Sequence, residues 1–365
     1  MNYKYLPLTV VEKGATMTDH NSLENVRSRA EEVDHLLRNS ILGSEERRLI
    51  NTMYGISNTQ KNSMPEMNRN DFTYVFFTRP MINLDEDNLV RDRHLAQYLN
   101  NSDKSVQRYV KMVLDTKQSL KGNESSAMLD KNSPFINIFS NTLETMSGWP
   151  DEVLESFVSE KGLRKETWGY ANSDNKIYYD FDLSMTFNNV VGEPVRKIID
   201  LWTSYMANLH TGKIMPHKEM IARREIDFMT AIYVVVVSRT NKKIKHVART
   251  IGYPVANPKG AAYDFNRAES KAAETATINT SFKCFGAEYD DPITLLEFNK
   301  AVGAIHPEVR QLIKTGRCNL VEIPSAYRSK LNYRGTPFID LRYNTLEFLA
   351  PDSDFKRVKK KIITE

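Results

Sequence analysis

The chain has 365 residues, of which 41% are hydrophobic and 26% are charged, a composition typical of folded globular proteins. Its formal net charge of +4 is too small to indicate binding of nucleic acid over the whole surface. The longest apolar run, Ala231 to Val237, is too short to cross a bilayer, so we expect no membrane partner. The two cysteines, Cys284 and Cys318, lack the spacing of metal ligands.

The first 70 residues carry only short apolar patterns. Apolar residues at helical spacing predict two short helices, Leu23 to Leu37 and Glu45 to Met53, and a polar linker follows at 57–70. A β run from Thr73 to Thr78 comes next. Its apolar residues do not alternate with polar ones, so we expect both of its faces to be covered.

Helical periodicity dominates the segment after this strand. Residues 88–115 show apolar positions at helical spacing. Further on, Asp151 is a suitable N-cap for a helix through Val153, Leu154, Phe157 and Val158. We therefore interpret residues 83–175 as a mainly helical insertion.

The clearest pattern in the chain runs from Ile177 to Phe187, where apolar and polar residues alternate strictly. Such a period of two predicts a long strand with one buried and one wet face. The expected core side includes Tyr179 and, as its central members, Phe181, Leu183, Met185 and Phe187. The expected wet side carries Asp180, Asp182, Ser184 and Thr186.

An amphipathic helix follows, with Pro194 at a position where the first turn tolerates proline. Its apolar stripe includes Ile198 and Trp202, which we place in the core. Two central strands are expected at 228–238, buried on both sides, and at 243–250. Another alternating strand at 276–287 places Ile278 and Phe282 in the core and Asn279 and Ser281 on the wet side.

The C-terminal part shows a helical pattern near 292–302, a last β run at 338–348 and a basic tail at 356–361. The whole pattern divides the chain into an N-terminal helical arm and linker (1–70), a first strand (71–82), the insertion (83–175), a β domain (176–295) and a C-terminal extension (296–365). We expect an α+β fold.

Few residues suggest chemistry. The sequence has no phosphate-binding glycine loop, no HExxH and no GxSxG motif. His210 and His217 lie seven residues apart without a nearby cysteine, which favours two loop histidines over a metal site. Asp180 and Asp182 lie on the wet side of a strand, where carboxylates are usually solvated rather than catalytic. We therefore assign no catalytic residue, metal or cofactor.

The order of features from Tyr178 to Tyr289 resembles the tail-tube family of contractile bacteriophages. The points of resemblance are the strand Phe181 to Phe187, the helix with Trp202, two central strands, the loop Gly252 to Pro258 and a final strand Ala276 to Phe282. The run Tyr74 to Pro80 also resembles tail structural proteins of large phages. The resemblance covers about a third of the chain and concerns pattern and order, not a catalytic signature.

This resemblance implies an antiparallel β-sandwich or partly closed barrel with one flanking helix. Six copies would form a homo-oligomeric ring of the virion's tail, without enzymatic activity, assembled in the host cytoplasm. Expected partners are adjacent tube or baseplate rings, sheath or wedge proteins and the tape measure. The wet residues would face the lumen, where acidic groups repel phosphate and double-stranded DNA passes without specific binding. The residues expected there are Asp180, Asp182, Ser184, Thr186, Asn279 and Ser281.

Other interpretations remain open at this stage. The chain is longer than a plain tube subunit, which favours a ring at the baseplate-proximal start of the tube. A neck or terminator ring that joins tail to head would also be a closed ring of identical copies. A tail-associated cell-wall hydrolase would use Asp180 and Asp182 as its carboxylates.

Overall fold

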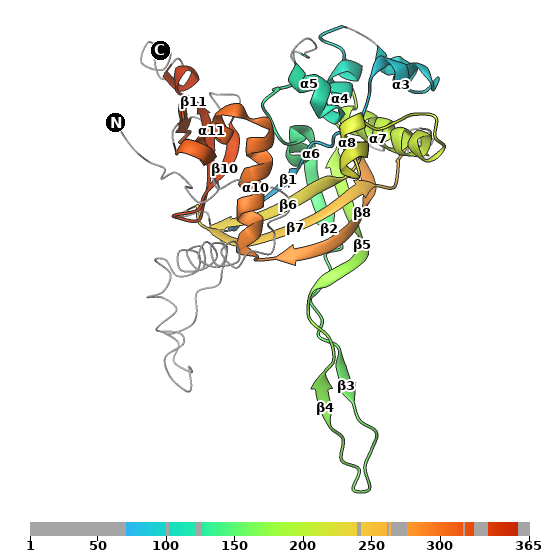
Figure 1. Ribbon diagram of the computed structural model, residues 1–365, viewed down its shortest axis with the longest axis vertical. Coiled ribbons are helices and arrows are strands. Elements are labelled where there is room, and N and C mark those ends of the chain that lie inside the picture. The colour runs from blue at the N-terminus through green and yellow to red at the C-terminus, as the bar shows by residue number, and fades with distance from the viewer. Residues whose placement is uncertain are drawn as a thin grey trace.

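The computed structural model describes residues 71–99, 102–121, 126, 128–238, 242–260, 263, 276–316, 318–324 and 335–356. The helices predicted at 23–37 and 45–53, the linker and most of the basic tail lie outside these residues. The described chain is α+β, as expected, and centres on one antiparallel sheet that curls into a half-barrel (Figure 1).

Six strands form this main sheet in the order β1-β6-β7-β8-β5-β2. The two long alternating segments form β5 and β8, and neighbouring strands pair in antiparallel register throughout. In sheet order the strands are β1 (Asp71–Phe77), β6 (Thr230–Ser238), β7 (Ile244–Pro254), β8 (Thr277–Tyr289), β5 (Ile177–Asn188) and β2 (Leu143–Ser147).

Helices cover one face of the main sheet. The longest is α7 (Pro194–His210), which begins with Pro194 at its first turn as predicted. It packs with α4 (Val106–Leu114) and α6 (Asn137–Thr142) over the apolar side chains of the strands. The same layer holds α3 (Glu86–Val90), η2 (Ala96–Leu99), α5 (Thr116–Lys121) and α8 (Lys218–Arg223).

The residues expected in the core lie in one apolar cluster on this covered face. Each is at most 8% exposed, and the indole of Trp202 meets the Phe282 ring edge-on at 6.3 Å. The Trp202 Nε1–H also donates to the Phe228 carbonyl at 2.9 Å. The eight residues are Phe181, Leu183, Met185, Phe187, Ile198, Trp202, Ile278 and Phe282.

A second apolar layer covers the opposite face, but only at the β1-β6-β7 end. It consists of α10 (Pro292–Ile305), α11 (Pro307–Thr315) and a small sheet of β9 (Leu320–Glu322), β10 (Thr336–Asp340) and β11 (Thr345–Pro351). On β6, Ile232 therefore points into the first cluster and Val235 into the second. The prediction that this strand is buried on both sides is confirmed.

The helix predicted from Asp151 is wrong. Residues 156–158 form β3 (Ser156–Val158), which pairs with β4 (Gly169–Ala171) in a hairpin. Apolar residues at 153, 154, 157 and 158 fit either period, and Phe157 finds a cross-strand partner in Tyr170. Local pattern alone could not show that partner, because it lies 13 positions along the chain.

Two smaller predictions also need correction. Tyr179, expected on the core side, is 55% exposed, because the pairing of β5 with β8 shifts between Ile177 and Asp180 and breaks the alternation there. The last β run, expected as one element, is two strands, β10 and β11, with Asn344 at positive φ in the turn between them.

Candidate functional surface

The polar side chains of β5 and β8 share one open face of the main sheet. Ser184 lies opposite Ser281, and Thr186 lies opposite Asn279. All four are exposed or partly exposed, while their chain neighbours point into the core. The structure thus brings together the side chains that the sequence placed on the wet side, namely Asp180, Asp182, Ser184, Thr186, Asn279 and Ser281.

The edge strand β2 extends this surface by two residues that sequence reasoning missed. Thr145 pairs with Thr186, and Ser147 pairs with Ser184. Two rows of small polar side chains therefore cross three strands. The signal in the sequence is only the short Thr–Met–Ser alternation at 145–147. It can be assigned to the polar face only when the pairing of β2 with β5 is known. We call the eight residues, together with Lys283, the polar face.

Lys283 changes the electrostatics expected for the polar face. Its Nζ lies 2.5 Å from Asp180 Oδ2 and 3.4 Å from Asp182 Oδ1. The hydrogen bond from Lys283 lowers the pKa of Asp180, and the same contact raises the pKa of Lys283. One of the two negative charges is thereby offset. Phosphate repulsion is weaker than the aspartates alone suggested, and the rest of the face is neutral.

The polar face ends where α10 crosses β7. There Arg249 Nη1 lies 2.9 Å from Glu288 Oε2 on β8 and 2.9 Å from Glu297 Oε2 on α10. Beyond this ion-pair cluster the sheet is covered by the C-terminal layer. The open region is therefore confined to β2, β5, β8 and the adjoining end of β7.

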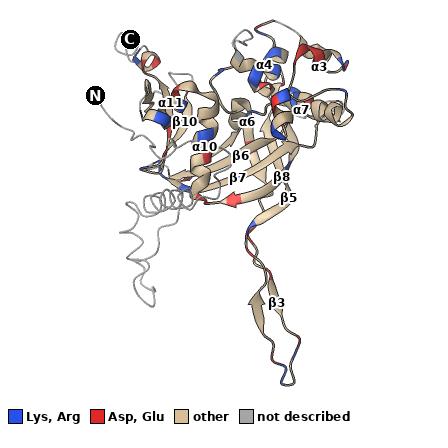
Figure 2. Ribbon diagram, in the orientation of Figure 1, with Lys and Arg blue, Asp and Glu red and all other residues tan. Residues whose placement is uncertain are grey.

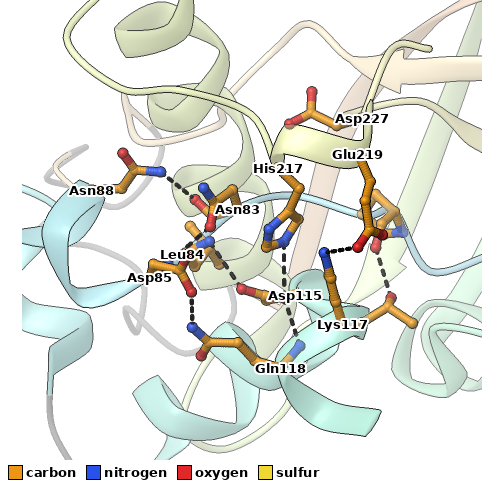
Figure 3. Close-up of polar contacts among 12 residues, drawn as sticks. Asn83, Leu84, Asp85, Asn88, Asp115, Lys117, Gln118, His217, Glu219 and Asp227 are labelled. Carbon is orange, nitrogen blue, oxygen red and sulfur yellow. Dashed lines mark hydrogen bonds and ion pairs between the residues drawn. The ribbon is translucent and has the colours of Figure 1, made fainter. Parts of the chain in front are cut away.

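A buried polar network joins three segments on the helix-covered side (Figure 3). At its centre Asp115, fully buried between α4 and α5, accepts from the Leu84 and Gln118 backbone N–H groups at 3.0 and 2.9 Å. Its Oδ1 also lies 3.5 Å from His217 Nε2. Nearby, Asn88 Nδ2 donates to the Met215 carbonyl at 2.9 Å.

Arg79, two residues after the end of β1, connects the sheet to this helical layer by hydrogen bonds. Its Nε and Nη2 donate to the Val113 and Met112 carbonyls at 3.0 and 2.5 Å, and Nη1 donates to the Ser133 carbonyl at 3.3 Å. Burial lowers the pKa of Arg79 to about 10, which still leaves it charged at neutral pH. Because each of these three Arg79 contacts joins residues that are at least 33 positions apart, the local pattern gave no sign of them.

The two histidines, both expected in loops, occupy different places: His217 lies in the loop before α8, whereas His210 belongs to α7. His210 is the exposed last residue of α7, whereas His217 is 6% exposed and caps α8 beside Asp115. In the described part of the chain no three His, Cys, Asp or Glu side chains gather as a metal site would require.

The aspartates of the polar face lack the surroundings of a general acid. Asp180 and Asp182 are exposed, and the pKa of Asp180 is lowered, whereas an acid catalyst needs a raised one. Cavities of about 470 and 360 Å³ lie elsewhere, beside α11 and at Trp149. No described helix is long and apolar enough to pass through a bilayer.

The main sheet thus has one face covered by helices and an opposite face that is open and polar at β2, β5 and β8. The sequence model of a family described as "Putative phage tail tube protein" matches residues 13–364. The chain therefore belongs to this family, and it is a structural component of the phage tail. The resemblance noted in the sequence is confirmed.

Comparisons with solved structures and with curated proteins add little to this assignment. One similar solved chain comes from an extracellular contractile injection system, the PVC sheath–tube complex in its extended state. It is 7% identical, the match covers 43% of this chain and 83% of that one, and the TM-score is 0.25, too low to carry an argument. A search of curated proteins found no match.

Proposed function

We propose that the chain forms a hexameric ring of the tail tube and that the polar face lines the bore through which the genome passes. The observation that carries this proposal is the pair of small, uncharged polar rows that cross β2, β5 and β8 on an otherwise well-packed sheet. Hydroxyl and amide groups offer phosphate no fixed positive charge, so DNA can slide past them.

The edges of the main sheet support ring closure. Among the described residues no strand pairs with the outer side of β2, so this edge of the sheet is open, whereas at the end of β1 the Phe77 carbonyl accepts from the Ile136 N–H at 2.8 Å. Edges of this kind pair readily with another chain, and a closed ring removes them. In the assembled ring, the sheets of neighbouring copies would join into one continuous barrel. The two-sheet sandwich that the family resemblance implies is part of this proposal.

We also infer a position at the baseplate-proximal start of the tube. The helical layer and the C-terminal layer add mass around the sheet that could contact sheath or wedge proteins. The tape measure and double-stranded DNA would occupy the bore. A neck or terminator ring remains the second candidate, because it needs the same sheet and the same closure. Assembly in the host cytoplasm is part of the first proposal.

Native mass spectrometry of the purified full-length chain, followed by electron microscopy, tests the ring. We expect a species of six copies and sixfold rings with a central hole. A chain that stays monomeric at every concentration would contradict the proposal. Immunogold labelling of phage particles separates the two positions: label at the baseplate end supports the tube start, and label below the head supports the neck ring.

A further inference from the structure

The segment between β2 and β5 leaves the body of the protein as a long hairpin, which we call the arm (residues 149–176). It continues the β2–β5 pair and extends away from both layers (Figure 1). Its backbone is held by the β3–β4 pairing, with further hydrogen bonds from Ser159 N–H to the Trp168 carbonyl at 2.7 Å and from Asn172 N–H to the Glu155 carbonyl at 2.8 Å.

The root of the arm is fixed to the body. Trp149 packs against Phe181 and Tyr289, with ring centroids 6.1 and 5.9 Å apart, and the Tyr289 hydroxyl donates to the Pro150 carbonyl at 2.6 Å. Gly148 has a φ of +107°, and a Cβ there would lie 2.3 Å from the Asp182 carbonyl oxygen. The direction in which the arm leaves the sheet is therefore set by β2 and β5.

Apolar side chains of the arm remain exposed on both of its faces. On one face Phe157 meets Tyr170 at 5.2 Å, and Trp168 beside them is 78% exposed. On the other face Leu154 and Val158 are 54% and 58% exposed. A two-stranded hairpin is only marginally stable alone in water, and exposed apolar patches of this kind mark interaction sites.

The arm is also charged unevenly along its length (Figure 2). Four of the five charged residues at its base are acidic, and three of the five at its tip are basic. The base holds Asp151, Glu152, Glu155, Asp174 and Lys176, and the tip holds Glu160, Lys161, Arg164, Lys165 and Glu166. All ten are exposed, and no ion pair between described residues links base to tip.

We propose that the arm of one copy packs along the arm of the next copy, with its basic tip against the neighbour's acidic base. This inference rests on the proposed ring. Two observations favour a second copy as the occupant. The complementary charges lie on the same element, which makes a head-to-tail contact that repeats around a closed ring. The arm also continues the edge hairpin β2–β5, so the seam between neighbouring copies leads directly onto it.

Charge reversal with rescue tests the contact. A tip variant carries Lys161→Glu, Arg164→Glu and Lys165→Glu, and a base variant carries Asp151→Lys, Glu152→Lys and Glu155→Lys. We expect each alone to raise the concentration at which half of the chain is assembled by about tenfold or more, which corresponds to about 1.4 kcal/mol. Combining both sets restores opposite charges and should recover most of the loss.

Reversal of Lys300 and Lys314, which are exposed on α10 and α11, is the matched control and should leave assembly unchanged. All reversed positions are exposed, so the melting temperature of the monomer should not change. Rings that form equally well in all variants, or a combined variant that assembles no better than the singles, would overturn the arm contact and leave the ring intact. Absence of rings in the unmodified chain would instead contradict the proposed function.

A photo-crosslinking residue in place of Trp168 identifies the occupant directly. In the assembled unmodified background, we expect a crosslinked product of two copies of this chain. A product with a different protein, or binding of the arm to phosphatidylcholine–phosphatidylglycerol vesicles in place of self-crosslinking, would overturn the inference.

Discussion

Replacement of Arg79 by methionine is the sharpest test of how the sheet and its helical layer hold together. Arg79 is 5% exposed and donates to three backbone carbonyls, two of which are at the C-terminal end of α4. Methionine keeps much of the side-chain length but donates nothing. The three carbonyls would remain buried without these donors.

The expected cost follows from two opposing contributions. Each buried acceptor left without a donor costs about 1–3 kcal/mol, so the three together cost about 6 kcal/mol. Against this, burial lowers the pKa of Arg79 from 12.5 to about 10. A shift of that size corresponds to roughly 3 kcal/mol for keeping the charge inside, which methionine does not require. We therefore expect Arg79→Met to lower the free energy of unfolding by about 3 kcal/mol.

Urea unfolding of the full-length chain, followed by tryptophan fluorescence, measures this change. Arg91→Ala is the matched control, because the Arg91 side chain is exposed and bonds one carbonyl, that of Lys213, so it should cost under about 0.5 kcal/mol. Arg79→Lys should be no better than Arg79→Met, since lysine keeps the buried charge without the planar fork. A loss below about 1 kcal/mol in Arg79→Met, or full stability in Arg79→Lys, would refute the reasoning.

Further predictions concern the pH dependence of stability and the close packing of Gly252 in β7. His306 Nδ1 accepts from the Val309 N–H at the start of α11, and burial lowers the His306 pKa, so stability should be full above pH 6.5 and fall as the pH drops through the lowered pKa. His306→Asn keeps an N-cap and should remove this dependence in urea unfolding at pH 7.5 and 5; an unchanged dependence would contradict the assignment. Gly252→Ala should cost about 1–3 kcal/mol in thermal unfolding, because its Cβ would lie 2.6 Å from the Lys283 carbonyl oxygen. Gly260→Ala, with nothing within 4 Å, should be near neutral, and equal effects of the two would count against the packing argument.

Local periodicity was enough to predict β5 and β8, which carry most of the polar face, and the helix α7 that covers the other face of the sheet. The alternation in β5 and β8 identified both the core side and the wet side, and Pro194 marked the start of α7. These features depend on neighbours within a few residues. The spacing of apolar and polar residues along the chain is therefore enough to predict these strand faces and the start of the helix.

Features that depend on distant partners were missed or misjudged. The strand β3 looked like a helix because Phe157 and its neighbours fit both periods until Tyr170 is known to pair with it. The ion pairs of Lys283 with the aspartates, and the Arg79 and Asp115 network, join residues far apart in sequence. Tyr179 was wrongly predicted to face the core, because the shift in β5–β8 pairing beside it cannot be recognised from the neighbouring residues in the sequence.

A cryo-electron microscopy reconstruction of the assembled ring tests the central claim most directly. It would measure the distance of the Ser184 and Ser281 side chains from the ring axis, relative to Trp202 on the helix-covered side. We expect the two serines at the smallest radius, facing an open channel, and Trp202 farther out. Serines that point outward, or that are covered by another part of the same copy, would contradict the account.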